Sequence, residues 1–309
     1  MKIKLLLSII AVATIAGCAG LSQIQDTITK FDQGVHSTST AQMNFFRAVQ
    51  VADCTNQFYK QAFSYATDEE DNFDLTGACT PTILTDDQIK IRQALMDAIT
   101  LYADKMATLA TSDDNKMLDS NSQNLAGTLN SMAKTHGFTN LSVASGVEAA
   151  IIAIANMKID QMRFSAIKKS ATEMQQHLES VVNSLKAENT NFAVGLASNI
   201  GAIELELRPI VASMHKQRGT MSFFDVVESR RIMQSVNPFS LVPIAETGGA
   251  ADPKADAQNV ALQLNAALDA VLTANNAIAN AGTGGIIAAV NDLIARAQAA
   301  QAIQVTLNK

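Results

Sequence analysis

The spacing of apolar residues between Met174 and Met214 constrains the fold of this chain most. Apolar side chains recur there at steps close to heptad spacing, and a pattern sustained this long is typical of a long helix in a bundle or coiled coil. Pro209 predicts a kink or the loss of one hydrogen bond in that helix, and Gly219 predicts its end. The positions on the apolar face are Met174, Leu178, Val181, Leu185, Phe192, Leu196, Ile200, Ile203, Leu207, Ile210 and Met214.

The composition of the chain also favours helices. Its 309 residues include 15 glycines, 5 prolines and no tryptophan, so residues that break helices are sparse. Sheet proteins usually show runs of β-branched and aromatic residues broken by turn residues, and such runs are not evident here. We therefore expect an all-α fold, an elongated multi-helix bundle with long heptad-patterned helices and a C-terminal helical hairpin.

Apolar periodicity predicts two further helices in the first third of the chain. The first covers about 20–66 and allows for an irregularity at Ser37–Thr40, where the sequence is polar. The second begins after Thr85, a capping residue, with Asp86 and Asp87 in its first turn, and runs to about Leu109.

The sequence signals for the ends of the remaining helices are weaker. A weak helix at about 115–135 and an apolar helix reaching Met157 precede the long one, and a short amphipathic helix follows Thr220. The range 237–252 contains Pro and Gly residues and is predicted to be a connector. Residues 253–309 should then form the hairpin, with its turn at Gly282–Gly285.

The first eighteen residues carry a targeting signal. Lys2 and Lys4 precede an apolar run that is shorter than the roughly 20 residues needed to span a bilayer, as in secretory signals. The sequence Ile15-Ala16-Gly17-Cys18 resembles the lipobox of bacterial lipoproteins. The resemblance implies that residues 1–17 are removed and that Cys18 carries acyl chains such as palmitate, leaving 18–309 as a single helical-bundle domain. Because Ala19 rather than Asp follows, it also implies the outer membrane. The alternatives are an ordinary secretory signal with a chance cysteine, or a buried N-terminal helix.

Two cysteines remain, Cys54 and Cys79. In an exported chain such a pair is expected to form one disulfide. Two unpaired buried thiols are the alternative, and a metal site is less favoured because neither cysteine has a neighbouring histidine.

Charge gives no reason to expect nucleic acid. Without Lys2 and Lys4 the chain has 21 basic residues against 29 acidic ones, a formal charge of −8. The surface is therefore mildly acidic.

No catalytic motif stands out, so we expect no catalytic residue, no cofactor and no metal site. The four histidines are scattered, and the pairing of Glu173 with His177 is interpreted as a solvated helix surface. The acidic stretch Asp68–Asp74 lacks the residue order of a calcium loop and is interpreted as a solvated charge run.

These observations predict a non-enzymatic protein of the cell envelope. Its lipid-anchored helical body would serve as a scaffold or protein-interaction module, with the membrane and an envelope protein as partners. One alternative is a carrier of a small apolar ligand or lipid in a cleft between helices. Another is a membrane-active protein, suggested by the apolar segments Val147–Met157 and Phe223–Val227. An envelope hydrolase is a more distant possibility, because catalytic residues need not be adjacent in sequence.

Overall fold

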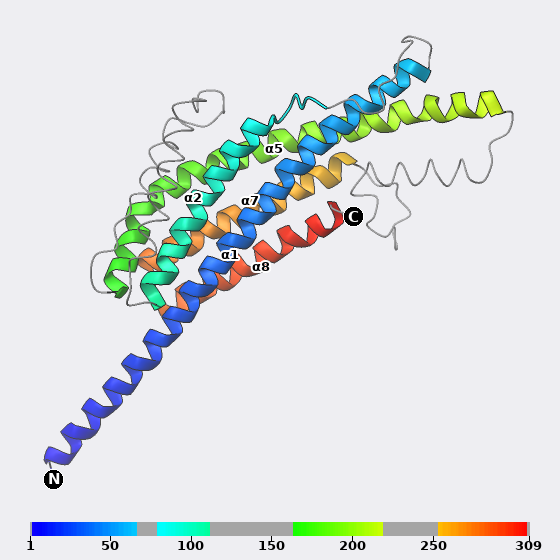
Figure 1. The fold of residues 1–309 in the computed structure, drawn as a ribbon. Helices are drawn as coiled ribbons and strands as arrows, with labels where there is room; N and C mark the ends of the chain where they lie inside the picture. The colour runs from blue at the N-terminus through cyan, green and yellow to red at the C-terminus, as the bar shows by residue number, and fades with distance from the viewer. Residues whose placement is uncertain (1, 67–78, 112–162, 219–252, 308–309) are drawn as a thin grey trace. The chain divides into compact units, whose positions relative to one another are not determined.

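A computed structural model describes residues 2–66, 79–111, 163–218 and 253–307. These ranges contain five helices and no strand, which confirms the predicted all-α helical bundle (Figure 1). The helices are α1 (Lys2–Ala66), α2 (Asp86–Thr111), α5 (Arg163–Arg218), α7 (Pro253–Asn280) and α8 (Thr283–Leu307). The helices predicted at 115–135, near Met157 and after Thr220 lie outside the described residues, as do the acidic stretch and the connector 237–252.

The two longest helices, α1 and α5, have 65 and 56 residues. Helix α1 continues through Ser37–Thr40, so the predicted irregularity there is wrong. The Thr38 hydroxyl donates a hydrogen bond of 2.9 Å to the carbonyl oxygen of Gly34, one turn earlier. Polar side chains in this stretch thus find acceptors within the helix, and no break is needed to satisfy them.

Helix α5 confirms the apolar pattern that predicted it. The backbone stays helical through Pro209 to Arg218, and the predicted end at Gly219 lies outside the described residues. Among its described side chains, the predicted apolar face is buried except for Phe192, which is half-buried. The buried members are Met174, Leu178, Val181, Leu185, Leu196, Ile200 and Ile203.

Helix α2 begins where its capping sequence predicts. The Thr85 hydroxyl accepts a hydrogen bond from the backbone N–H of Gln88 at 3.3 Å, and the Gln88 side chain accepts one from the Thr85 N–H at 3.0 Å. This reciprocal pair is a capping box, which satisfies two backbone donors at the start of the helix. Asp86 and Asp87 lie in the first turn, where negative charge is favourable.

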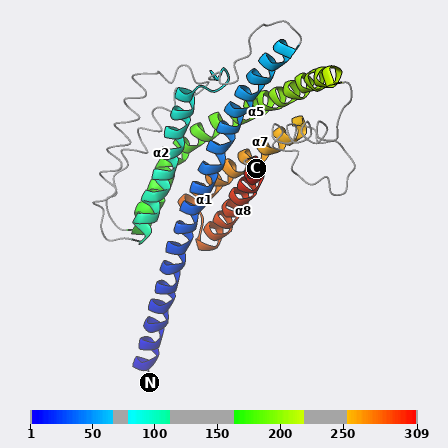
Figure 2. The ribbon, with the colours of Figure 1, turned by 45° about the vertical axis from the view of Figure 1, so that its right-hand side comes forward.

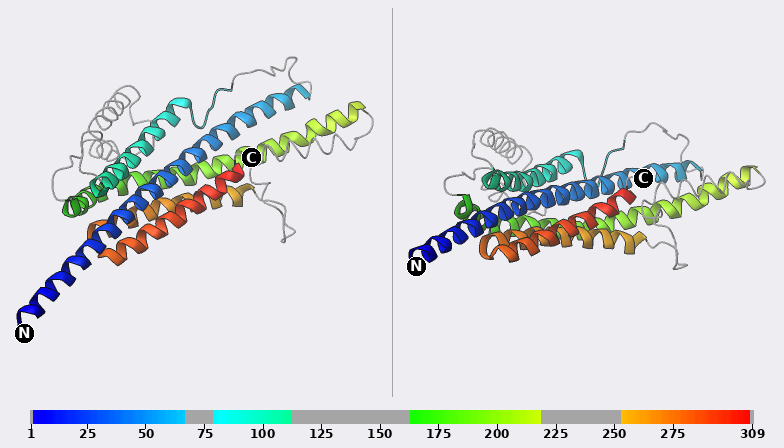
Figure 3. Two further views of the ribbon diagram at one scale, coloured as in Figure 1. Left: turned by 60° about the horizontal axis from the view of Figure 1, so that its bottom comes forward. Right: turned by 90° about the horizontal axis from the view of Figure 1, so that it is seen from below.

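The predicted C-terminal hairpin is present. Helices α7 and α8 run antiparallel and lie side by side in every view (Figures 2 and 3). Only Ala281 and Gly282 connect them, so Gly284 and Gly285 belong to the first turn of α8 and not to the predicted turn. The connection can be this short because the N–H of Ile286 already bonds to the carbonyl oxygen of Gly282 at 3.1 Å.

The described helices contribute to two compact units. Unit 1 comprises Met1–Ser39, Ala94–Ser184 and Ala266–Gln298, and unit 2 comprises Thr40–Gln93, Leu185–Asn265 and Ala299–Lys309. Each of the five helices supplies residues to both units.

A buried polar network joins three helices in the core of unit 1. The Tyr102 hydroxyl donates to the Asn275 side-chain oxygen at 2.5 Å, and the Asn275 amide donates to Gln175 at 2.8 Å and to the carbonyl oxygen of Ala171 at 3.0 Å. Phe31 packs edge-on against Tyr102, with ring centroids 6.3 Å apart. Buried polar groups with partners like these favour one helix register over others.

A close approach of α8 to α1 shapes another part of unit 1. A Cβ placed on Gly34 would lie 2.7 Å from Cγ of Leu293, whose side chain is fully buried. Apolar spacing predicts Ile287, Val290, Ile294 and Ala297 on the core face of α8, but Ile287 and Ile294 are only half-buried. Val290 and Ala297 are buried as predicted, and the other buried residues of α8 are Ile286, Leu293 and Ala300. The Leu293 side chain occupies the space beside Gly34, and Cδ1 of Ile294 lies 3.4 Å from the same Cβ position.

Gly34→Ala is therefore expected to destabilise the protein, although alanine favours helices over glycine by about 1 kcal/mol. Overpacking of a tight core costs about 1–3 kcal/mol, which outweighs that gain. Gly201→Ala is the matched control, because nothing lies within 4 Å of a Cβ there. Urea unfolding should show a lower midpoint for Gly34→Ala and a higher one for Gly201→Ala. Stabilisation of both variants would contradict the close packing at Gly34.

A buried ion pair lies in the core of unit 2. The Arg92 guanidinium bonds to both carboxylate oxygens of Glu188, at 2.7 and 3.1 Å, and these residues are 4 % and 6 % exposed. The guanidinium carbon lies 5.5 Å from the ring centre of Phe46 and 5.1 Å from that of Phe192. The cation is thus held by a bidentate carboxylate and by two aromatic rings.

Amide side chains form a second polar group in unit 2. Gln42 and Asn189, both fully buried, exchange hydrogen bonds through their amides, and the Asn189 amide also donates to Asn265 at 3.0 Å. These contacts link α1, α5 and α7 within the unit. Asn265 is also one of the residues that line a surface groove.

Candidate functional site

The predicted anchor residue, Cys18, lies in the N-terminal part of α1, where the structure describes the backbone but not the side chains. Within the described ranges, none of the helices combines the length and apolar character needed to cross a bilayer. Acylation of Cys18 remains a prediction.

The predicted disulfide is present in unit 2. It joins Cys54 on α1 to Cys79, in the segment that leads into α2, with the two Cα atoms 5.4 Å apart. This separation lies in the usual range for a disulfide.

Hydrogen bonds reinforce the attachment of this segment to α1. Asp53, which is 4 % exposed, accepts hydrogen bonds from the backbone N–H groups of Thr82 at 2.6 Å and of Ile83 at 3.1 Å. Burial opposes ionisation of Asp53, but these hydrogen bonds outweigh it and hold the pKa of the carboxyl below its ordinary value. The Gln50 and Gln57 amides donate to the carbonyl oxygens of Leu84 and Thr80. One face of α1 therefore fixes the entry to α2.

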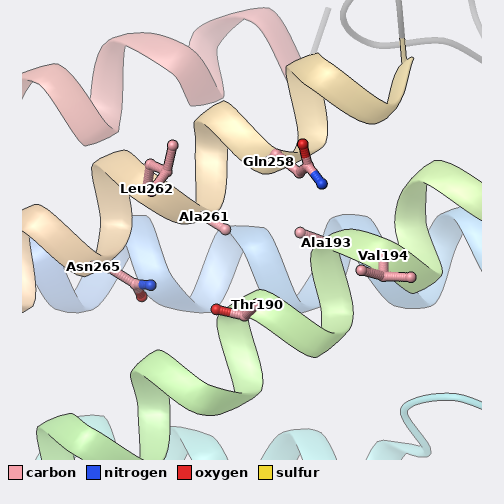
Figure 4. Close-up of a pocket in the computed structure, with 7 residues that line it drawn as sticks. All are labelled: Thr190, Ala193, Val194, Gln258, Ala261, Leu262 and Asn265. Carbon is pink, nitrogen blue, oxygen red and sulfur yellow. The ribbon is translucent and has the colours of Figure 1, made fainter.

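A surface groove lies between α5 and α7 in unit 2. Figure 4 shows Ala193 on α5 and Ala261 on α7 facing each other across it. The volume is about 240 Å³, and the other lining residues are Thr190, Val194, Gln258, Leu262 and Asn265. The two alanines lie at the centre of the groove, and their small side chains leave room for an incoming group.

Exposed apolar side chains flank the groove. Val194 is 57 % exposed and Leu262 is 66 % exposed, and both are among the lining residues. Thr190, Gln258 and Asn265 add hydroxyl and amide groups beside them. An apolar centre with a few polar groups around it is the usual anatomy of a surface that binds a partner.

A second cluster of functional side chains lies in unit 1. Nε2 of His36 is 2.9 Å from Oδ1 of Asp104 and 3.5 Å from Oδ1 of Asp32. Asp32 and His36 are one turn apart on α1, and Asp104 is on α2. The ligand atoms of the three residues all lie within 4.8 Å of one another.

The environment of Asp32 raises its pKa to about 6. Burial is the main cause, the negative charge of Asp104 and a shared hydrogen bond add to it, and His36 acts in the opposite direction. Its Oδ1 atom is buried and accepts no hydrogen bond. The repulsion between the carboxyl groups of Asp32 and Asp104 is therefore only partly offset by the attraction of His36.

The sequence pattern predicted neither the groove nor the cluster of Asp32, His36 and Asp104. The spacing of Asp32 and His36 by four residues on a predicted helix was a readable signal, because it puts both on one face. Asp104 is 68 residues beyond His36, and nothing in the sequence pairs α1 with α2 in this register. Glu173 is exposed and lies 3.8 Å from Lys169, which agrees with the solvated helix surface expected around Glu173 and His177.

Comparisons with protein-family models, with curated proteins and with solved structures give no match for this chain.

Proposed function

We propose that this protein is a lipid-anchored, non-enzymatic module of the cell envelope that binds a partner protein through the groove between α5 and α7. The observation that carries the proposal is the pair of exposed apolar side chains, Val194 and Leu262, beside the small residues Ala193 and Ala261. An apolar side chain of the partner would fill the groove, and burial of the flanking residues would add about 25 cal/mol per Å² of apolar surface.

The size of the groove favours a protein partner over a carried lipid. Sites that enclose drug-sized ligands have volumes of roughly 300–1,000 Å³ and bury most of the ligand. The groove has about 240 Å³ and is open to solvent, with Leu262 and Gln258 exposed. It therefore suits one or two apolar side chains, whereas an acyl chain would remain largely in water. A carrier of a small apolar ligand is the alternative, and the apolar lining is what favours it.

The proposed compartment follows from residues 1–18 and from the disulfide. The lipobox-like sequence ending at Cys18 places the acyl chains on that residue, most simply in an outer membrane. The Cys54–Cys79 bond supports export, because disulfides persist mainly in oxidising compartments.

Site-specific photocrosslinking in intact cells tests the binding half of this proposal. A photoreactive amino acid at position 262 should give a discrete adduct with the mass of a second protein. The same group at Val51, which is 63 % exposed on α1 but does not line the groove, is the matched control. Lipid adducts at 262 would support the carrier alternative, and adducts of equal yield at both positions, or none, would refute a binding groove.

Fractionation of Cys18→Ala tests the anchoring half. Loss of the acylation site should move the protein from the membrane fraction to the soluble fraction of the envelope, because no acyl chain then holds it. Val51→Ala, with the signal intact, should stay with the membranes. Unchanged membrane association of Cys18→Ala would show that the anchor lies elsewhere.

A further inference from the structure

We propose that Asp32, His36 and Asp104 in unit 1 form a binding site for a divalent transition-metal ion, preferably zinc. This site is separate from the proposed groove, which involves none of these residues.

The positions of the three side chains fit the geometry of zinc. Zinc binds nitrogen and oxygen ligands at about 2.0–2.2 Å, so neighbouring ligand atoms in a tetrahedral site are about 3.3–3.5 Å apart. Nε2 of His36 lies 2.9 Å from one carboxylate oxygen and 3.5 Å from the other. All three ligand atoms lie within 4.8 Å of one another, so an ion could be coordinated among them after small side-chain adjustments.

One oxygen atom of the cluster, Oδ1 of Asp32, has an ion-pair contact to His36 but no hydrogen bond. Oδ1 of Asp32 is buried and accepts no hydrogen bond, which normally costs about 1–3 kcal/mol. The same atom faces Nε2 of His36 at 3.5 Å. A cation coordinated by Oδ1 would compensate for the absent hydrogen bond and would offset the repulsion between Asp32 and Asp104.

The exposure of the cluster allows an ion to enter. The side chains of His36 and Asp104 are 50 % and 44 % exposed, whereas that of Asp32 is 19 % exposed. Zinc sites with three protein ligands keep a fourth position for water, and the solvent side of this cluster provides it.

The ligand set selects among metals. Imidazole suits zinc and other late first-row metals, whereas Ca²⁺ takes six to eight oxygen ligands and Mg²⁺ keeps several waters. Two carboxylates and one imidazole are too few oxygens for calcium, but they match the three-ligand sites of zinc. The competing interpretation is a polar contact without metal, in which His36 bridges the two carboxylates.

Titration of the full, untagged chain in detergent with Zn²⁺ alone, after removal of metals with a chelator, tests the proposal. Isothermal calorimetry should show one saturable equivalent, and His36→Gln and Asp104→Asn should each weaken it at least tenfold, since each removes one of the three ligands. His177→Gln on α5 is the matched control and should leave the affinity unchanged. Replacement by Co²⁺ should give visible absorption bands typical of a low-coordinate site, and these should be absent from His36→Gln.

Several outcomes would overturn the inference. They are an absence of saturable Zn²⁺ binding, equal affinity in the wild type and in both ligand variants, and competition by Ca²⁺ at equal concentration. Both substituted side chains are about half exposed, so folding should survive, and far-ultraviolet circular dichroism of each variant verifies it. If Asp104→Asn unfolds, the His36→Gln titration and the Co²⁺ spectrum still decide the question.

Discussion

Arg92→Met is expected to lower the free energy of unfolding by about 3–5 kcal/mol, the usual effect of removing one partner from a buried ion pair. Methionine fills a similar volume between Phe46 and Phe192, so packing is largely kept. The loss comes from Glu188, which is 6 % exposed and would be left without its counter-charge. Urea unfolding followed by circular dichroism measures this difference.

The double variant Arg92→Met/Glu188→Leu is the control for this prediction. It removes both charges and should recover most of the lost stability, because an apolar pair of similar volume can replace a buried ion pair at little cost. A loss below about 1 kcal/mol in the single variant would mean that water reaches the carboxylate and that the pair behaves as a surface salt bridge.

The effect of Arg92→Met should depend on pH. Burial raises the pKa of Glu188 above its ordinary value of 4.5, and the attraction of Arg92 limits that rise. Without Arg92 the pKa rises further, so the folded protein holds a proton that the unfolded chain releases. Stability from such a group is present below the unfolded pKa and is lost as pH rises through the folded pKa. The deficit of the variant should therefore be small at about pH 4 and larger at about pH 7.

Removal of the disulfide by Cys54→Ala/Cys79→Ala is expected to cost about 3–4 kcal/mol in the chain-entropy model, for a loop of 25 residues. The hydrogen bonds of Asp53 to Thr82 and Ile83 remain, so the segment should still lie on α1 in the native state. The cost therefore arises mainly from the greater freedom of the unfolded chain. Chemical unfolding of the oxidised wild type and of the double variant gives the difference.

The reduced wild type is the control for the disulfide. It should unfold at the same urea concentration as the double variant, because both lack the cross-link. A double variant as stable as the oxidised protein would mean that the bond constrains the unfolded chain little. A much larger loss, with changed circular dichroism of the native state, would mean that the bond also holds the fold itself.

Sequence predicted the described helices well, because each depends on local signals, although α1 begins at Lys2 and not near residue 20. The apolar spacing from Met174 predicted the face of α5, and the Thr85–Gln88 capping box set the start of α2. The disulfide was predictable because Cys54 and Cys79 are the only cysteines after Cys18. These features need no knowledge of which helices touch.

Features that depend on the register between helices were not predictable. Leu293 of α8 packs closely against Gly34 of α1, and a glycine in a helical sequence does not show which residue will pack against it. Arg92 and Glu188 are 96 residues apart, and each alone resembles an ordinary surface charge. Asp104 joins Asp32 and His36 for the same kind of reason, since contacts between helices far apart in sequence bring them together.

The bond between Cys54 and Cys79 changes what a cut in the chain can do. A protease that cleaves any peptide bond between these residues opens a loop, but it leaves the two pieces covalently joined while the bond is oxidised. Everything from α2 onward would then still be linked to α1 and to Cys18. Release of the C-terminal part would require both cleavage and a reductant, so the cross-link makes the integrity of the protein insensitive to a single nick in that stretch.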